Sequence, residues 1–110
     1  MALALDYPDA YLARFCTDDR EARAFAEVDL ISASKDLTYS TDWRNKCAQL
    51  KTYVLACLEN QGAPDDLFAS KLKSYQAEFT AAVARADSDA NATAENTESA
   101  LIFNIPLARA

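Results

Sequence analysis

The sequence contains no histidine and only one glycine, Gly62. Without histidine, the chain lacks the commonest general base of enzymes and the commonest side-chain ligand for metal ions. With one glycine, it cannot build the glycine-rich loop that holds a phosphate through several backbone amides. We therefore expect neither an enzyme nor a protein that depends on a cofactor or a metal ion.

Cysteine is also scarce, with Cys16, Cys47 and Cys57 as the whole set. Cys47 and Cys57 belong to one expected helix and are separated by about 15 Å of helical rise, which is too far for a disulfide. Cys47 could act as a nucleophile, but no imidazole is present to activate it. We expect buried thiols in a reducing compartment.

No apolar run is long enough to span a bilayer, and the first residues, MALALDYPDA, lack the basic start and long apolar core of a secretory signal peptide. Acidic residues outnumber basic ones by 17 to 11, giving a formal charge of −6. Binding DNA through its phosphates needs clustered lysine and arginine instead. We expect a cytosolic protein that binds neither a membrane nor a specific DNA sequence.

Three stretches place apolar residues at helical spacing, and few glycines or prolines interrupt them. Thr17 is suited to cap the first long helix, near 18–36. Its expected buried stripe is Ala22, Ala26, Leu30, Ala33 and Leu37, widened by Phe25, Val28 and Ile31. A short helical turn from Ala10 to Phe15 is expected before it.

The second long helix starts after Ser40 or Thr41 and ends near Gly62. Its apolar seam is Trp43, Cys47, Leu50, Val54 and Cys57. The third starts at Pro64 and ends at Ala86. Its stripe is Phe68, Leu72, Tyr75, Phe79, Ala82 and Ala86. The pattern predicts an all-α fold, with three long helices in an antiparallel bundle, preceded by a short N-terminal helix.

Two acidic groups come nearest to a metal site: Asp18, Asp19 and Glu21, and Asp65 with Asp66. Each group stands at the start of an expected helix, where the helix dipole favours negative charge. The dipole accounts for both groups, so we assign no metal to them.

Trp43 has two interpretations, because tryptophan is frequent both in cores and at binding surfaces. Its place at the head of the seam favours core packing over a recognition patch formed with the turn around Tyr39.

After the bundle (1–86), residues 87–99 have the composition of a polar linker, and residues 100–110 form an apolar, strand-like arm. The arm could fold back on its own bundle or dock on another chain. Docking is favoured because the linker could extend to roughly 40 Å, more than closing onto the bundle requires. The expected partner contacts are Leu101, Ile102, Phe103, Ile105, Pro106 and Leu107.

Three segments resemble the head-to-tail adaptor (connector) proteins of tailed bacteriophages: YLARFCTDDREARAFAEVDLISASKDL, TDWRNKCAQLKTYVLACLENQG and the tail ending SALIFNIPLARA. The family has a body of three or four helices, and a ring of copies sits beneath the portal. Many members carry a longer loop with a small hairpin after the central helix. Here Gly62, Ala63 and Pro64 lead directly into another long helix.

The resemblance implies a structural protein of the virion neck, assembled in the host cytoplasm and joined to the portal and to other neck or tail proteins. It also implies a homo-oligomeric ring, of about twelve copies by analogy with the family. DNA would pass through without sequence-specific binding. The alternative is a small regulatory or chaperone-like helical module whose C-terminal segment docks on one protein partner. A count of subunits separates the two.

Overall fold

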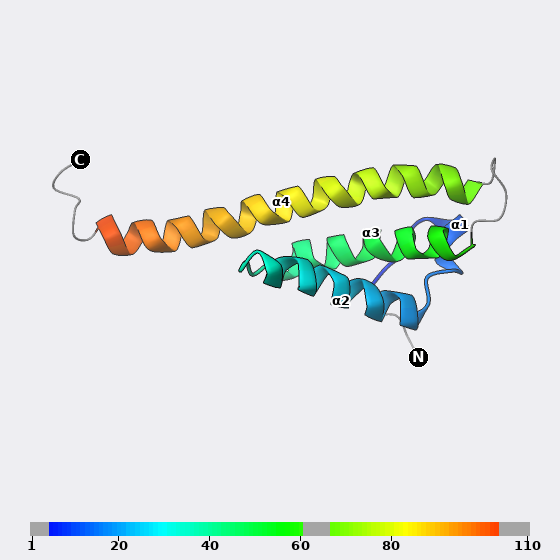
Figure 1. Cartoon of the computed structure of the whole chain (residues 1–110), viewed down its shortest axis with the longest axis horizontal. Coiled ribbons are helices and arrows are strands. Elements are labelled where there is room, and N and C mark those ends of the chain that lie inside the picture. The colour runs from blue at the N-terminus through cyan, green and yellow to red at the C-terminus, as the bar shows by residue number, and fades with distance from the viewer. Residues whose placement is uncertain (1–4, 61–66, 104–110) are drawn as a thin grey trace.

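The computed structural model describes residues 5–60 and 67–103, with side chains described as far as residue 92. These residues form four helices and no strand (Figure 1). The helices are α1 (Ala10–Ala13), α2 (Asp18–Ser34), α3 (Thr41–Asn60) and α4 (Leu67–Phe103). The all-α fold, with three long helices packed together and a short one before them, is confirmed.

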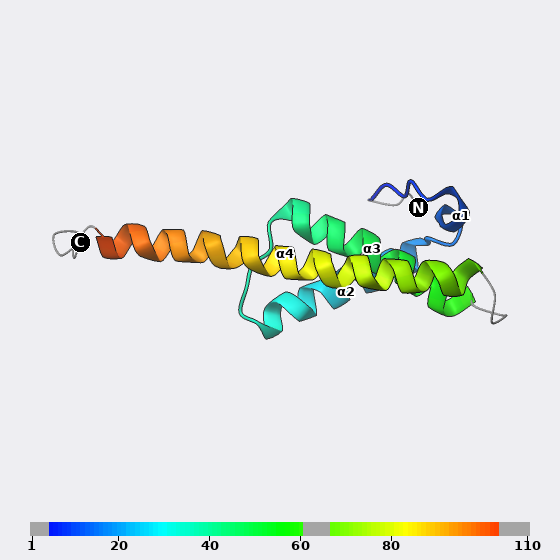
Figure 2. The same ribbon diagram turned by 90° about the horizontal axis from the view of Figure 1, so that it is seen from above.

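α3 is the central helix, because it packs against α2 on one side and α4 on the other. Successive long helices run in opposite directions, and α1 lies near the end of the bundle where α3 finishes and α4 begins (Figures 1 and 2). α4 is much the longest helix and continues past the α2–α3 connection (Figure 2). The molecule is therefore elongated, measuring 64 × 31 × 23 Å.

Side chains just before the helices fix where they begin. The Thr17 hydroxyl accepts a hydrogen bond from the Arg20 amide, as predicted for the residue that caps α2. The Ser40 hydroxyl does the same for the Trp43 amide at the start of α3. The Asp9 carboxylate accepts from the amides of Tyr11 and Leu12 and caps α1. Each cap satisfies amides that have no partner within the helix.

The apolar seam predicted on α3 forms the centre of the core. Cys47, Leu50, Val54 and Cys57 are each at most 2% exposed, while Trp43 is partly buried. The stripe on α4 also faces the core: Phe68, Ala82 and Ala86 are buried, and Leu72, Tyr75 and Phe79 pack against them. Both predictions are confirmed.

The stripe predicted on α2 was wrong for most of its members, which lie on the solvent side, whereas Val28 is buried and Phe25 and Leu37 pack against the core as predicted. Ala22, Ala26 and Ala33 are exposed, and 69% of Leu30 is accessible to solvent. The buried residues of α2 are Glu21, Ala24 and Val28, of which only Val28 was predicted. A glutamate was not expected in the core, but its carboxylate accepts hydrogen bonds from Tyr7 and from the backbone of Leu5, which offset the cost of burying the charge.

The polar linker predicted over 87–99 is helical in the structure, because α4 continues for 37 residues to Phe103. The predicted strand is likewise corrected at Leu101–Phe103, which belong to α4. Alanine is frequent in this segment and neither glycine nor proline occurs between Leu67 and Phe103, so the helix can propagate. The side chains of Asp87 and Ala90 also hold the first turn of the segment 87–99 against the bundle.

Candidate functional site

The predicted partner contacts fall at the far end of α4. Leu101, Ile102 and Phe103 form its last residues, while Ile105, Pro106 and Leu107 lie outside the described residues. The last buried position on α4 within the described side chains is Ala90, which is 6% exposed. Phe103 lies thirteen residues further along, or about 20 Å of helix. Among the described residues, no other helix accompanies this part of α4 (Figure 1).

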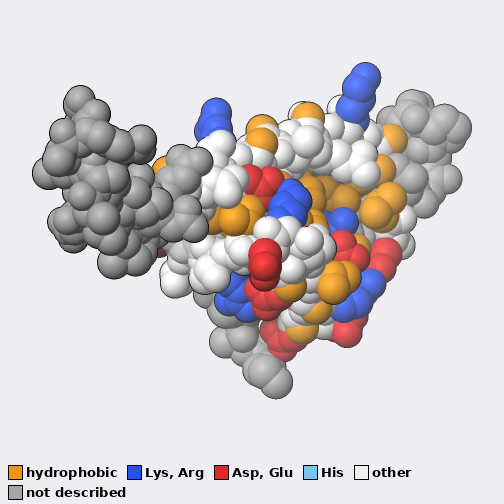
Figure 3. Space-filling view, turned by 60° about the vertical axis from the view of Figure 1, so that its left-hand side comes forward, with side chains coloured by type: hydrophobic (Ala, Val, Ile, Leu, Met, Phe, Trp, Pro, Cys, Tyr) orange, Lys and Arg blue, Asp and Glu red, His pale blue; other side chains and the backbone are white. Residues whose placement is uncertain are grey.

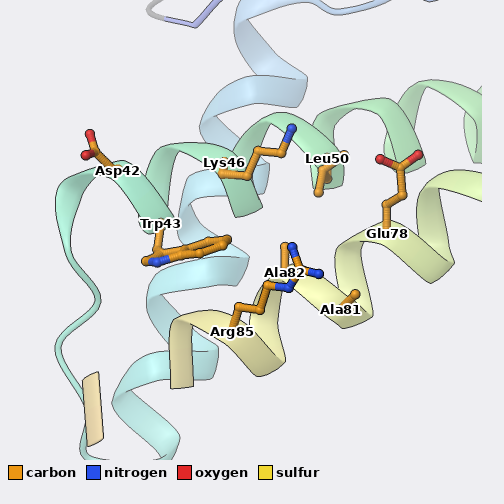
Figure 4. A pocket seen from close by; sticks show the side chains of 8 residues that line it. All are labelled: Asp42, Trp43, Lys46, Leu50, Glu78, Ala81, Ala82 and Arg85. Carbon is orange, nitrogen blue, oxygen red and sulfur yellow. The ribbon is translucent and has the colours of Figure 1, made fainter. Parts of the chain in front are cut away.

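The bundle itself carries a groove between α3 and α4, which we call the Trp43 groove (Figure 4). Its volume is about 450 Å³. It is lined by Asp42, Trp43, Lys46 and Leu50 of α3 and by Glu78, Ala81, Ala82 and Arg85 of α4. The two alanines leave room opposite the indole ring, so the groove follows from small side chains on one helix facing a large one on the other.

The base of the Trp43 groove is apolar and its rim is charged. Leu50 and Ala82 are buried, whereas Lys46 and Arg85 are exposed. Arg85 extends from α4 toward α3, and the Asp42 carboxylate points away from the indole ring (Figure 4). Because Asp42 and Glu78 stand at the rim as well as Lys46 and Arg85, such a surface can accept an apolar side chain at its base and charged groups of either sign at its rim.

The cations at this rim are available for a partner. Six other lysines and arginines have a carboxylate oxygen within 3.6 Å: Arg20, Arg23, Lys35, Arg44, Lys51 and Lys71. Lys46 and Arg85 have none at that distance among the described residues. Elsewhere, cationic and anionic side chains are interspersed around hydrophobic patches, as one face shows (Figure 3). The groove thus places two cations that have no ion pair among the described residues beside a partly buried indole, together with the carboxylates of Asp42 and Glu78.

Asp9 stands at the centre of a polar cluster that is already saturated. Its carboxylate accepts hydrogen bonds from Lys71 Nζ at 2.8 Å and from the Tyr75 hydroxyl at 2.6 Å. Its amide donates to the Tyr53 hydroxyl at 2.9 Å. Burial raises the pKa of Asp9, but the bonds from Lys71 and Tyr75 outweigh it and lower that pKa overall. The cluster fastens the start of α1 to α3 and α4.

A second saturated cluster surrounds the buried Glu21. The Tyr7 hydroxyl lies 2.7 Å from Glu21 Oε2 and 3.3 Å from the Thr52 hydroxyl, and the Leu5 amide lies 3.0 Å from the same carboxylate oxygen. Burial raises the pKa of Tyr7, so this hydroxyl stays protonated and remains a donor. The cluster joins the N-terminal segment to α2 and α3, and we assign it a structural role.

Asp87 anchors the exit of α4 from the bundle. Its carboxylate accepts from Lys35 Nζ at 2.7 Å and from the Tyr39 hydroxyl at 2.5 Å. Both donors belong to the connection between α2 and α3. Although burial raises the pKa of Asp87, the hydrogen bonds from Lys35 and Tyr39 lower that pKa overall. Asp87 thus sets the direction in which the projecting end of α4 leaves the molecule.

The three cysteines are buried thiols, as predicted. Burial raises the pKa of Cys16 to about 12 and that of Cys47 to about 11. Thiols with such pKa values are protonated near neutral pH and are poor nucleophiles. Within residues 5–60 and 67–103, no group of three or more acidic, histidine or cysteine side chains could hold a metal ion. Asp65 and Asp66 lie outside the described residues.

The sequence indicated only part of the Trp43 groove. Trp43 is both the partly buried head of the α3 seam and a wall of the groove, so the two interpretations of it are compatible. Lys46 and Arg85 were not predicted as site residues. The available signal was the pair Ala81–Ala82, two small residues on the face of α4 that meets α3, but pairing them with Trp43 requires the tertiary structure.

No helix in the described part of the chain is long and apolar enough to cross a membrane. Comparison with family models, with curated proteins and with solved structures gave no match.

Proposed function

We propose that the protein is a structural head-to-tail adaptor of a phage neck, which forms a ring beneath the portal and docks through its C-terminal arm. The observation that carries the proposal is the projection of α4, which takes the chain about 15 Å beyond Ala90 before the apolar arm begins at residue 100. A projecting helix that ends in apolar residues is suited to reach another chain.

The length of this projection favours docking on another chain over folding back. Leu107 follows Phe103 by four residues, which span at most about 14 Å even when fully extended. This is less than the distance from Phe103 back to Ala90. The apolar residues of the arm therefore need a surface on another molecule to leave water.

The charge of the chain also agrees with this role. A ring with a net negative charge on each copy repels the phosphates of DNA, so a duplex can slide through it without sticking. The adaptor would be assembled in the host cytoplasm and would act in the virion by holding portal and tail proteins together, without catalysis.

The test is the mass of the full chain, measured by light scattering alone and with a purified portal protein. A ring-sized assembly, or a stoichiometric complex with the portal, supports the proposal. Phe103→Asp should abolish the portal complex and leave the melting temperature of the bundle unchanged, because Phe103 lies far from the core.

Asn91→Asp is the matched control, since it adds the same charge at an exposed position on the same helix. A monomer that ignores the portal would contradict the adaptor, and a Phe103→Asp variant that melts the bundle would contradict docking by the arm. A one-to-one complex with some other single protein would instead favour a regulatory or chaperone-like module.

A further inference from the structure

We propose that two copies of the chain associate face to face across the Trp43 groove, with their α4 helices antiparallel. The inference goes beyond the proposed function, because it concerns a contact between two free copies and not the contact with the portal. The surface combines the groove with the exposed face of α4 beside it, which consists of Ser74, Glu78, Ala81, Arg85 and Ser88.

The exposed face of α4 is continuous with the Trp43 groove. Its five residues recur at spacings of four and three, so they share one side of the helix. Three of them, Glu78, Ala81 and Arg85, also line the groove (Figure 4). The face and the groove therefore form one surface that a single partner can cover.

The charges on this face are arranged so that the face complements itself. Glu78 and Arg85 are seven residues apart, which is about 10 Å along the helix, and the midpoint falls between Ala81 and Ala82. A twofold axis through this midpoint, perpendicular to α4, brings Glu78 of each copy opposite Arg85 of the other. The two ion pairs form together, because a twofold axis makes them equivalent.

The balance of charge favours a second copy over a strongly acidic or strongly basic partner. The rim of the groove carries two carboxylates and two cations, none of which has an ion pair among the described residues: Asp42, Glu78, Lys46 and Arg85. A partner of one sign would meet like charges at two of these positions. Two copies with a formal charge of −6 each repel one another in most orientations, whereas this surface lets them meet with opposite charges in contact.

Small side chains near the axis allow the two α4 helices to approach closely. Ala81 is exposed and lies beside the midpoint. Helices with small residues at their contact can pack with their axes about 8 Å apart. The second helix then covers the mouth of the groove and shields the partly buried indole of Trp43 from water. This burial stabilises the contact, and the ion pairs, which contribute little when exposed, fix its orientation.

The first experiment measures the mass of the full chain without portal, by light scattering over a concentration series. The mass should rise from 12.1 kDa, the mass of one copy, to twice that value and then stay constant. A twofold contact is closed, so it adds no third copy.

Charge reversal tests the two ion pairs. Arg85→Glu should weaken the association at least tenfold, because it places a carboxylate opposite each Glu78. Glu78→Arg should do the same with two cations. An equimolar mixture of these variants should associate more tightly than either alone, since one copy then carries two acids and the other two bases. The double variant should also recover, because exchanging the residues restores both pairs.

Lys73→Glu is the matched control, because it makes the same change of charge at an exposed position of α4 outside this surface. It should associate as the natural chain does. At a concentration where the natural chain is monomeric, all of these variants should keep its helical signal in circular dichroism, since none of the substituted side chains is buried.

Trp43 provides an independent readout, because it is the only tryptophan in the chain. Its fluorescence emission should shift to shorter wavelength as the mass doubles and the indole leaves water. The shift should be absent in Arg85→Glu and present in Lys73→Glu.

The proposal is overturned if the chain stays monomeric at every concentration, or if it associates without a change in Trp43 emission. It is also overturned if the mixture of Arg85→Glu and Glu78→Arg associates no better than either variant alone. The adaptor function fails separately, because it depends on Phe103 and the portal. A charge-dependent dimer that ignores the portal contradicts the adaptor alone, while a Phe103-dependent portal complex of a chain that never dimerises contradicts this contact alone.

Discussion

Two apolar residues of α2, Val28 and Leu30, have opposite surroundings although only one residue separates them. Val28 is completely buried, whereas 69% of Leu30 is exposed. Successive residues of an α-helix are rotated by about 100°, so two residues further along the rotation is about 200° and the two side chains point to nearly opposite faces, about 160° apart. The face that meets α3 is thus centred on Val28, and Leu30 contributes little to the core.

We expect Val28→Ala to lower the free energy of unfolding by about 2 kcal/mol, since it removes buried methyl groups and leaves a cavity. Leu30→Ala removes more atoms but should change the free energy by less than about 0.5 kcal/mol, because its side chain is in water. Urea denaturation of the two variants measures both values. A larger loss for Leu30→Ala would mean that the face of α2 has been assigned incorrectly.

Among the elements, α4 differs from the other helices because only part of it belongs to the bundle. As far as Ala90 it presents buried residues to α3, and Asp87 ties it to the connection between α2 and α3. Beyond Ala90 it continues without another described helix beside it (Figure 1). Its first part stabilises the fold, while its second part is available for an interaction.

Proline substitutions at two positions of α4 should therefore have unequal effects. Thr97→Pro should reduce the helical signal in circular dichroism but leave the melting temperature unchanged, because residue 97 lies beyond the packed part of the helix. Ala86→Pro should lower the free energy of unfolding by about 3 kcal/mol or more, since it breaks the helix where Ala86 is fully buried. Equal loss of thermal stability in both variants would contradict this division of α4.

At the scale of the whole molecule, ion pairs and hydrogen-bonded carboxylates join segments that are far apart in the sequence. Asp9 connects the N-terminal segment to α4, and Asp87 connects α4 to the end of α2. Glu59 near the end of α3 accepts hydrogen bonds from Arg23 and Arg20 of α2, which lower the pKa of Glu59 to about 2. The tertiary arrangement thus depends on carboxylates that remain ionised.

These lowered pKa values predict a stability that falls in acid. A carboxylate whose pKa is lower in the folded chain than its unfolded value of about 4 stabilises the fold above that value, and the effect is lost as the pH falls. We expect the urea midpoint to be constant from neutral pH to about 5 and to decline between about pH 4 and 2. The individual contributions are reduced by solvent screening where the pairs are exposed.

Asp9→Asn tests the best-buried member of this set, because only 10% of the Asp9 side chain is exposed. Asparagine still caps a helix, so the variant removes the charge and leaves the cap. It should lower the urea midpoint at neutral pH and flatten its decline in acid. An unchanged acid profile would show that Asp9 does not contribute to it.

The sequence alone determined the features that depend on neighbouring residues: the helical class, the helix start at Thr17, the seam of α3 and the burial of the cysteines. A periodic pattern of apolar residues and a capping side chain act within one or two turns, so local sequence specifies them.

Only the tertiary structure decided the buried face of α2, the continuation of α4 through 87–99 and the presence of the Trp43 groove. Each depends on partners far along the chain: Tyr7 makes Glu21 acceptable in the core, Tyr39 lies 48 residues from Asp87, and Ala81 faces α3. Such contacts form only when separate helices are packed together, because their energy depends on distance in space and not in sequence.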